Sequence, residues 1–481
     1  MHPTFNCGRR RRESLALCVL LLVASHAARA QGDFEFGEQR VEQTGPCLSD
    51  DQRSAVIAML EHNRLQLVRE DKLSVAAPAV VSFAWPLRPK PGFTDPGYYG
   101  VGNFVDHNAS FPNAVLDYNC GARTYDLDTG YSHMGTDYFL SPFPWNKMDN
   151  GEIQVVAAAS GTIIGKSDGN FDRSCDFSGG EWNAVYVQHA DGSMAWYGHL
   201  KNGSLTAKGV GQTVAQGEFL GLVGSSGNSP TPHLHFEVHD RSMNLIDPYS
   251  GPCNSLSTTS WWSAQRPYYD RGLNKISTHS APVSWGTCPN QDVTNIQTNF
   301  VPGSRIYFYL FGRDGVAGDT YHCEILRPNG STWDAWDRLF DFAPYWSAYY
   351  LSWFRTIPSN ETWGQWTWRV SYNGVRYDQK FYIGLSTGVG DRAATDLRVS
   401  CQPNPFNPRV TINYLIPSPG AVSLRVYDAS GRLVATLLHD AWTPAGDHTT
   451  FWDGSGFASG VYFLRLTAAG LTNTQKIVLL K

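Results

Sequence analysis

The clearest pattern of hydrophobic and polar positions runs from residue 232 to residue 239, where the two classes alternate residue by residue. Strict alternation has the period of a half-buried β-strand, because successive side chains point to opposite faces of a sheet. The apolar positions would face a core, and they are Leu234, Phe236 and Val238. The polar positions share the other face, and they are His233, His235, Glu237 and His239. The alternation alone leaves two interpretations open: a metal-directed site, or a solvated strand face that is rich in histidine.

Helical periodicity is expected in one stretch near the N-terminus. Ser49 is an N-cap residue type ahead of Asp50 and Asp51, and apolar residues then recur at helical spacing to about Glu70. This pattern predicts one short helix over residues 50–70. It either belongs to an inhibitory pro-segment or packs on the domain that follows.

The rest of the chain shows short strand patterns separated by Gly, Pro and Asn turns, which predicts a mainly β protein. We expect an antiparallel β-sheet domain with a groove, followed by two β-sandwich, Ig-like domains. The expected boundaries are 31–79 for the N-terminal helical segment, 80–250 for the sheet domain, 251–285 for a connector, 286–385 for the first sandwich, 386–394 for a linker and 395–481 for the second sandwich.

A long Gly-, Pro- and Asn-rich connection spans residues 88–132. A loop of this length is usually functional, so we expect it to form one wall of the groove. Its aromatic residues either line that wall or pack the loop onto the core, and they are Tyr98, Tyr99, Phe104, Tyr118 and Tyr125.

The N-terminus has the features of a secretory signal peptide over residues 1–30. Four arginines precede a short apolar run, and Ala28, Arg29 and Ala30 form an Ala-x-Ala cleavage site. Cleavage there would remove five Arg and one Glu and lower the formal charge from −5 to −9. The mature chain is then too acidic to indicate a nucleic-acid partner, and it contains no apolar stretch long enough for a transmembrane segment.

Seven cysteines remain after that cleavage, and an exported chain can form disulfides between them. Because seven is odd, at least one thiol stays unpaired. Cys120 and Cys175 fall in two loops of the sheet domain and are one candidate pair, while Cys288 and Cys323 are another. The absence of a Cys-x-x-Cys sequence argues against a cysteine zinc site.

Two further histidine fragments precede the alternating strand. They are His-Met-Gly-Thr-Asp at 133–137 and Tyr-Gly-His-Leu at 197–200. Together with His-Leu-His-Phe-Glu at 233–237, this ordered set resembles the LytM/lysostaphin-type zinc endopeptidases of peptidase family M23. The resemblance covers roughly residues 80–250.

The resemblance implies a role for each residue of these fragments. By this comparison His133, Asp137 and His235 are the three Zn²⁺ ligands. His199 and His233 correspond to the two catalytic histidines that do not bind metal. Such imidazoles would orient and deprotonate a water molecule and stabilise the tetrahedral oxyanion.

The last 85 or so residues carry a second resemblance. Its sequence elements lie at 403–408, 426–432, 460–462 and 474–481. They are similar to the C-terminal sorting domain of the type IX secretion system, in its type A, Ig-like form. This resemblance implies a Gram-negative source, type IX secretion machinery as a partner, and a secreted or cell-surface protein. The alternative is an accessory Ig-like domain that stays on the protein.

Together these features predict a secreted zinc metalloendopeptidase of the peptidoglycan hydrolase type. Its expected substrates are peptide bonds in peptidoglycan cross-links, or extracellular proteins. The alternative is a non-catalytic cell-surface binding or adhesion protein that uses an M23-like domain to hold wall peptides.

Overall fold

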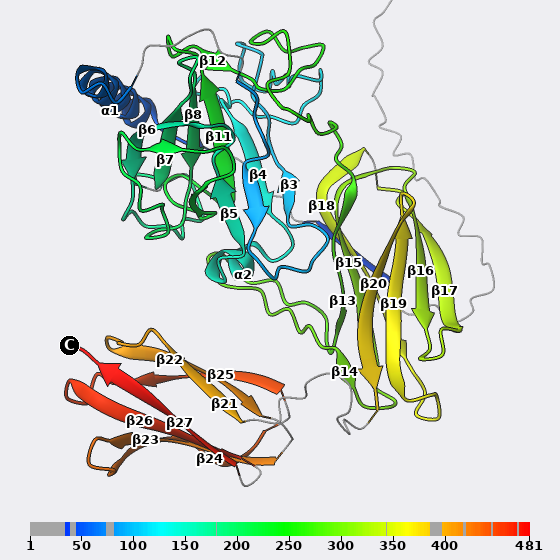
Figure 1. Ribbon diagram of the computed structural model, residues 1–481. Coiled ribbons are helices and arrows are strands. Elements are labelled where there is room, and N and C mark those ends of the chain that lie inside the picture. The colour runs from blue at the N-terminus through cyan, green and yellow to red at the C-terminus, as the bar shows by residue number, and fades with distance from the viewer. Residues whose placement is uncertain are drawn as a thin grey trace, which may run out of the picture. The chain divides into compact units, whose positions relative to one another are not determined.

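The structure is a computed structural model that describes residues 34–38, 45–73, 81–178, 180–342, 344–384, 397–416, 420–443, 446–468 and 471–481. The predicted signal peptide and the predicted linker at 386–394 lie outside these ranges. The described chain is mainly β, as predicted, and divides into two compact units, residues 1–385 and 386–481 (Figure 1). Within the described ranges, no helix combines the length and apolar character that crossing a membrane requires.

An eight-stranded antiparallel sheet dominates the N-terminal half of the first unit (Figure 1). Its strands are, in spatial order, β3 (Tyr99–Val101), β4 (Thr136–Leu140), β11 (His233–His239), β8 (Met194–Gly198), β7 (Ala184–Gln188), β6 (Gly161–Ser167) and β9 (Thr213–Val214), with β12 (Leu245–Ile246) paired to β11. A three-stranded sheet accompanies it, in the order β10 (Phe219–Leu222), β5 (Ile153–Val156) and β2 (Leu87–Pro89). The alternating stretch is therefore a central strand, with a neighbour on each side.

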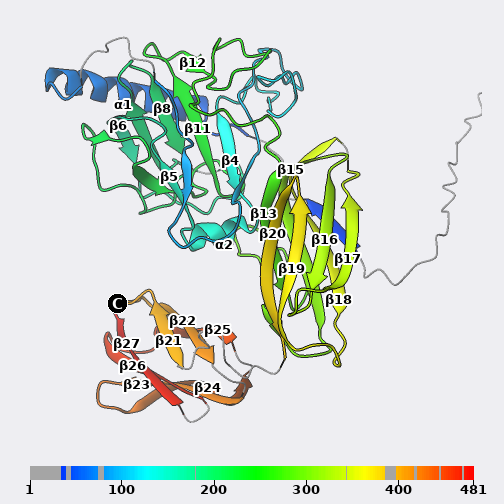
Figure 2. The ribbon, with the colours of Figure 1, turned by 45° about the vertical axis from the view of Figure 1, so that its right-hand side comes forward.

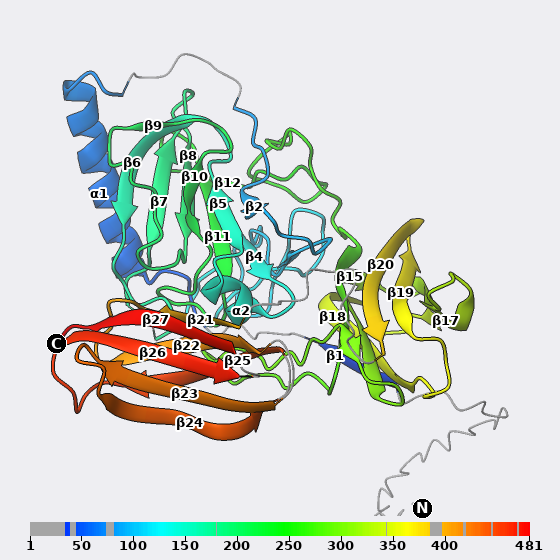
Figure 3. The ribbon, with the colours of Figure 1, turned by 60° about the horizontal axis from the view of Figure 1, so that its bottom comes forward.

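The two faces of β11 have different surroundings. The apolar side chains Leu234, Phe236 and Val238 are buried in the main core of this domain, as the alternation predicts. On the side of β6, β7 and β8 that Figure 3 displays, helix α1 (Asp50–Arg69) lies along the sheet. Its buried residues Val56 and Leu60 belong to a core cluster that includes residues of all three strands.

Helix α1 confirms the predicted helix and its N-cap. The Ser49 hydroxyl accepts from the backbone N–H of Gln52, and the Gln52 side chain accepts from the backbone N–H of Ser49. This reciprocal pair satisfies two N–H groups that would otherwise lack partners. A second helix, α2 (Pro144–Asp149), was not predicted; it spans only six residues and begins with a proline at its first position.

Both suggested disulfide pairs are wrong. The structure instead joins Cys120 to Cys253 and Cys175 to Cys288, with Cα–Cα separations of 5.1 and 5.8 Å. In each pair the second cysteine lies beyond the sheet domain, in chain that folds back onto it. Cys323 is a buried free thiol in the core of the sandwich.

A β-sandwich completes the first unit, and Figure 2 shows its two layers. One sheet has the order β1 (Phe34–Glu38), β18 (Tyr345–Thr356), β15 (Arg305–Val316) and β13 (Gly272–His279). The other has the order β14 (Asn299–Phe300), β20 (Val375–Ile383), β19 (Gly364–Tyr372), β16 (Thr320–Leu326) and β17 (Thr332–Leu339). Strands β1 and β13 lie N-terminal to the range 286–385 and nevertheless pair within this sandwich.

The aromatic residues of the long connection at 88–132 pack it onto the core. Tyr99, Phe104, Tyr118 and Tyr125 are all buried. The same loop is tied to the sandwich by the guanidinium group of Arg123, which donates to the Asp314 carboxylate of β15 at 2.8 Å. Both side chains are almost fully buried, so the connection is held between the two parts of this unit.

The second unit is a smaller sandwich with its own core. One sheet contains β21 (Arg398–Gln402), β22 (Arg409–Ile416) and β25 (Gly446–Asp453), and the other contains β24 (Leu433–Thr443), β23 (Gly420–Asp428), β26 (Gly460–Ala468) and β27 (Leu471–Leu479) (Figure 3). Its buried positions alternate along β22 and β26, as expected for strands with one face against a core.

Candidate active site

Strand register brings the predicted site residues together. In the antiparallel pairing of β4 with β11, Asp137 lies directly opposite His235. On the other side of β11, His235 lies opposite Gly198, the last residue of β8, and His199 follows at once. His199 has a left-handed backbone φ of 60°, which is uncommon for a residue with a side chain and occurs often at functional sites. Three neighbouring strands thus deliver Asp137, His235 and His199 to one region.

His133 reaches the same region from the turn before β4. Its Nδ1 donates to the backbone carbonyl of Phe104 at 2.7 Å, and its Nε2 lies 3.1 Å from Asp137 Oδ2. The glycine between them, Gly135, leaves room for His235, because a Cβ there would lie 2.6 Å from that imidazole. This explains the glycine of the His-x-Gly-x-Asp sequence.

His235 is held from both ends of its ring. Its Nδ1 lies 2.9 Å from Asp137 Oδ1, and its Nε2 lies 3.1 Å from Glu237 Oε2. A carboxylate that accepts from Nε2 keeps the proton there and leaves the Nδ1 lone pair for a metal ion. The M23 resemblance gives Glu237 no role, although the alternation places Glu237 on the same strand face as His235.

His199 and His233 have a common arrangement. The Nδ1 of His199 donates to the backbone carbonyl of Ser226 at 2.6 Å, and that of His233 donates to the carbonyl of Thr231 at 2.8 Å. The Nε2 atoms of both rings are buried and make no hydrogen bond within the described residues. Their ring centroids are 4.4 Å apart, and His233 Nε2 lies 3.7 Å from Asp137 Oδ1. Two imidazole nitrogens thus remain available beside the carboxylate.

A group of four buried residues has the composition of a metal site. Ligand atoms of Cys47, His133, Asp137 and His235 all lie within 4.8 Å of one another. Nitrogen, oxygen and sulfur are the donors that Zn²⁺ prefers. Within the described residues, the buried Nε2 of His133 makes no hydrogen bond, and a buried nitrogen of this kind suits a metal ligand. Cys47 was not predicted here; it comes from a distant segment, which the absence of a Cys-x-x-Cys sequence does not address.

The pKa shifts in the site favour an ionised Asp137 carboxylate and a neutral His199 ring. Burial raises the pKa of Asp137, but the nearby His133 and His235 outweigh burial, so that this pKa lies well below its ordinary value. Burial and the neighbouring His233 lower the pKa of His199, which keeps that ring neutral near pH 7. A neutral imidazole can accept a proton.

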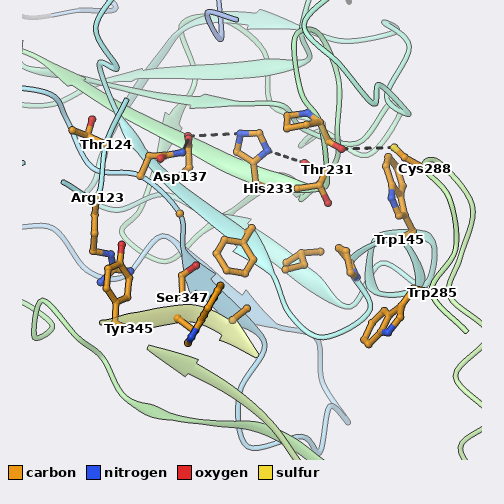
Figure 4. A pocket seen from close by; sticks show the side chains of 18 of the residues that line it. Arg123, Thr124, Asp137, Trp145, Thr231, His233, Trp285, Cys288, Tyr345 and Ser347 are labelled. Atoms are coloured by element: carbon orange, nitrogen blue, oxygen red, sulfur yellow. Dashed lines mark hydrogen bonds and ion pairs between the residues drawn. The ribbon is translucent and has the colours of Figure 1, made fainter. Parts of the chain in front are cut away.

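A cleft of about 510 Å³ opens beside this group (Figure 4). Asp137 and His233 form part of its wall, and Figure 4 shows them linked across the upper part of the view. Aromatic side chains from three parts of the chain also line it, and they are Trp145 of α2, Trp285 of the connector and Trp346 of β18. The volume falls within the range of pockets that bind small molecules.

Two family models match parts of this chain. The family model described as peptidase family M23 matches residues 133–248. The chain carries an M23 peptidase domain. The match begins at His133 and includes Asp137, His199, His233 and His235. A second model, described as a secretion system C-terminal sorting domain, matches residues 400–480, which contain most of the second unit.

Curated relatives match the M23 domain and part of its surroundings. Lysostaphin of Staphylococcus simulans is 27% identical over 240 residues, which are 47% of this chain and 42% of the relative. The DD-carboxypeptidase/endopeptidase Mpg of Neisseria meningitidis serogroup B is 41% identical over 112 residues, or 23% of this chain and 21% of the relative. The peptidoglycan DD-endopeptidase ShyC of Vibrio cholerae is 30% identical over 149 residues, or 28% and 30%. The chain spans less than half the length of each of these proteins.

Proposed function

We propose that this protein is an exported zinc metalloendopeptidase that hydrolyses peptide bonds in peptidoglycan cross-links. The observation that carries the proposal is the convergence of Asp137 with four imidazoles at the adjoining strands β4, β8 and β11. In three of these rings, Nδ1 donates to a backbone carbonyl and a buried Nε2 makes no hydrogen bond within the described part of the chain.

In this proposal His133 Nε2, His235 Nδ1 and a carboxylate oxygen of Asp137 hold the zinc ion. The contact of Glu237 with His235 Nε2 fixes the tautomer that presents Nδ1. A bound zinc ion supplies Lewis acidity, which polarises a peptide carbonyl and lowers the pKa of a water molecule.

His199 and His233 would handle protons and the developing negative charge. Each Nδ1–H is held by a backbone carbonyl, so each Nε2 lone pair is directed into the site. The neutral ring of His199 can take a proton from water as a general base. His233 forms part of the cleft wall, and once its Nε2 has also taken a proton it would be in position to donate to the oxyanion of a substrate bound there.

The substrate proposal rests on the cleft and on the relatives. The aromatic walls formed by Trp145, Trp285 and Trp346 suit a peptide of small side chains lying flat against them. Two of the matched relatives are named as endopeptidases, and one of these is named as acting on peptidoglycan. The sorting domain supports type IX export of this activity to the cell surface or beyond.

The proposal is tested by zinc analysis and by cleavage of purified cross-linked muropeptides. Products are followed by mass spectrometry through long incubations, so that slow turnover is detected. His235→Ala should lose both zinc and cleavage, because it removes a ligand. His199→Ala should keep zinc while turnover falls by about 10²–10⁴-fold, the usual contribution of a general acid or base.

A matched control is His322→Ala, which removes a half-exposed histidine of β16 in the sandwich. This variant should keep both zinc and turnover. A protein that binds muropeptides without cleaving them would instead be the wall-binding alternative. Loss of zinc from His199→Ala, or full activity in His235→Ala, would overturn the roles proposed here.

A further inference from the structure

The segment at 45–49 lies across the metal-binding group. Cys47 Sγ is 3.5 Å from the hydroxyl of Tyr125, which also donates to the carbonyl of Gly45 at 3.4 Å. The side-chain amide of Asn228 donates to the carbonyl of Pro46 at 2.9 Å. Asn228 belongs to the loop that leads into β11. Two side chains beside the metal-binding group, those of Tyr125 and Asn228, therefore donate to backbone carbonyls of this segment.

The segment is fixed in this position by the chain that follows it. Leu48 is buried in the core between α1 and the sheet. Ser49 caps α1 and forms the reciprocal pair with Gln52. One turn later, Arg53 makes a two-pronged ion pair with Glu237 of β11, at 2.5 and 3.0 Å. Cys47 is thus delivered by an ordered N-terminal element that is anchored on the same strand as His235.

Sulfur completes the donor set of the site. Cys47 is 2% exposed, and its Sγ lies within 4.8 Å of ligand atoms of His133, Asp137 and His235. Zinc sites with four protein ligands are closed, whereas catalytic zinc keeps one position for water or substrate. We propose that the Cys47 thiolate is a fourth metal ligand that holds the enzyme latent. This inference rests on the proposed function, and it adds the regulation of that site.

Latency then follows from simple exclusion. While the thiolate is bound, it fills the metal position that water or substrate needs. The side-chain amide of Asn228 meanwhile donates to the backbone carbonyl of Pro46 and not to a substrate. Activation requires the metal–sulfur bond to break, the sulfur to take a proton from solvent, and the segment to leave. Neither a redox step nor a second protein is needed. Removal of the sulfur by mutation should have the same effect.

The test uses the full chain from residue 31 with Co²⁺ in place of zinc. A thiolate bound to Co²⁺ gives an intense near-ultraviolet charge-transfer absorption that nitrogen and oxygen ligands do not give. The wild-type protein should bind one Co²⁺ and show this band. Cys47→Ser should still bind one Co²⁺ through the other ligands and lose the band. Cys401→Ser removes a buried free thiol of the second unit and should leave the band unchanged.

A second measurement uses only the wild-type protein, in case Cys47→Ser does not fold. Iodoacetamide labelling of the three free thiols is compared with zinc bound and after chelation, and labelled peptides are identified by mass spectrometry. Cys47 should be protected by zinc, while labelling of Cys323 and Cys401 should not depend on it.

Muropeptide cleavage by Cys47→Ser should rise about 100-fold if the closed form outnumbers the open form 99 to 1.

The outcomes separate this inference from the proposed function. One bound Co²⁺ without the charge-transfer band, or labelling of Cys47 that ignores zinc, overturns the thiolate ligand and leaves the metallopeptidase proposal standing. A wild-type protein that binds no Co²⁺ overturns both. A band that disappears in Cys47→Ser without any rise in cleavage overturns the latency and keeps the ligand.

Discussion

Replacing Glu237 by glutamine should weaken zinc binding by 10–100-fold, although Glu237 is not one of the proposed ligands. Its carboxylate accepts from His235 Nε2 at 3.1 Å and from His239 Nε2 at 2.6 Å, and it pairs with Arg53. The pKa of Glu237 is raised by burial but lowered further by Arg53, so that it lies well below its ordinary value and the group is charged near pH 7. An amide of the same shape keeps the packing and removes the charge.

Two separate magnitudes follow from this environment. Loss of a carboxylate that holds a metal-binding histidine costs 10–100-fold in metal affinity, or about 1.4–2.8 kcal/mol. Loss of one partner of a buried ion pair costs about 3–5 kcal/mol in folding stability, because the other charge stays buried alone. Arg53, whose side chain is 12% exposed, is the charge left behind. The Glu237→Gln variant should therefore be both less stable and weaker in zinc binding.

A double variant separates the two effects. Arg53→Met with Glu237→Gln removes both charges and should recover much of the stability, whereas zinc affinity should stay low. All variants are made in a Cys47→Ser background, so that movement of the N-terminal segment does not alter the ligand set. Affinity is measured by competition with a chromophoric chelator, and stability by urea unfolding of the metal-free proteins. Wild-type zinc affinity in Glu237→Gln, or an equal loss of affinity in Arg53→Met alone, would refute the reasoning.

Three further predictions concern other parts of the chain. Leu60→Ala should lower the free energy of unfolding by about 2–5 kcal/mol, since this side chain is fully buried on the face of α1 that packs against the sheet. Leu65→Ala on the exposed face of α1 should change it by less than about 0.5 kcal/mol. Urea denaturation measures both. Burial lowers the pKa of His279 in the sandwich from an ordinary 6.5 to about 4. The folded protein therefore keeps its full stability above pH 6.5 and loses up to about 3 kcal/mol as the pH drops toward 4, because the unfolded chain takes up the proton first. His279→Gln should flatten that part of the profile of stability against pH relative to wild type. Deletion of residues 386–481 should leave zinc binding intact, because that range forms a separate unit. In the native host the same deletion should trap the protein in the periplasm. Normal export of the shortened chain would contradict the sorting role.

Local sequence patterns were sufficient for the central strand β11 and for α1. The alternation along β11 identified a strand and the side chains on each of its faces. This was possible because successive side chains of a strand point to opposite faces, so polar and apolar residues alternate with a period of two. Helix α1 carried both a capping residue and apolar periodicity. The six-residue helix α2 is too short to show a helical period, and its only local signal was Pro144 at the first position.

Contacts between distant segments could not be predicted in this way. Cys47 touches Tyr125, 78 residues away, and nothing in the sequence around either residue marks the pairing. The disulfide pairs were predicted wrongly for the same reason. Cys253 and Cys288 reach Cys120 and Cys175 because the chain after the sheet domain folds back onto that domain. The roles carried over from the M23 resemblance remain predictions, although the register of β4, β8 and β11 brings their residues together.

The pairing of β1 with β18 has a consequence for the order of folding. The hydroxyl of Tyr350 in β18 donates to Glu35 in β1 across 315 residues of chain. Contacts of such long range form slowly, because the chain between them must be ordered first. During synthesis or translocation from the N-terminus, the pairing of β1 with β18 must wait until β18 has emerged. The stretch that holds Cys47 begins soon after β1, and its docking surfaces on β11 and the loop before it are also made later. The N-terminal elements should therefore be among the last parts of this unit to settle, on a sheet that is already built.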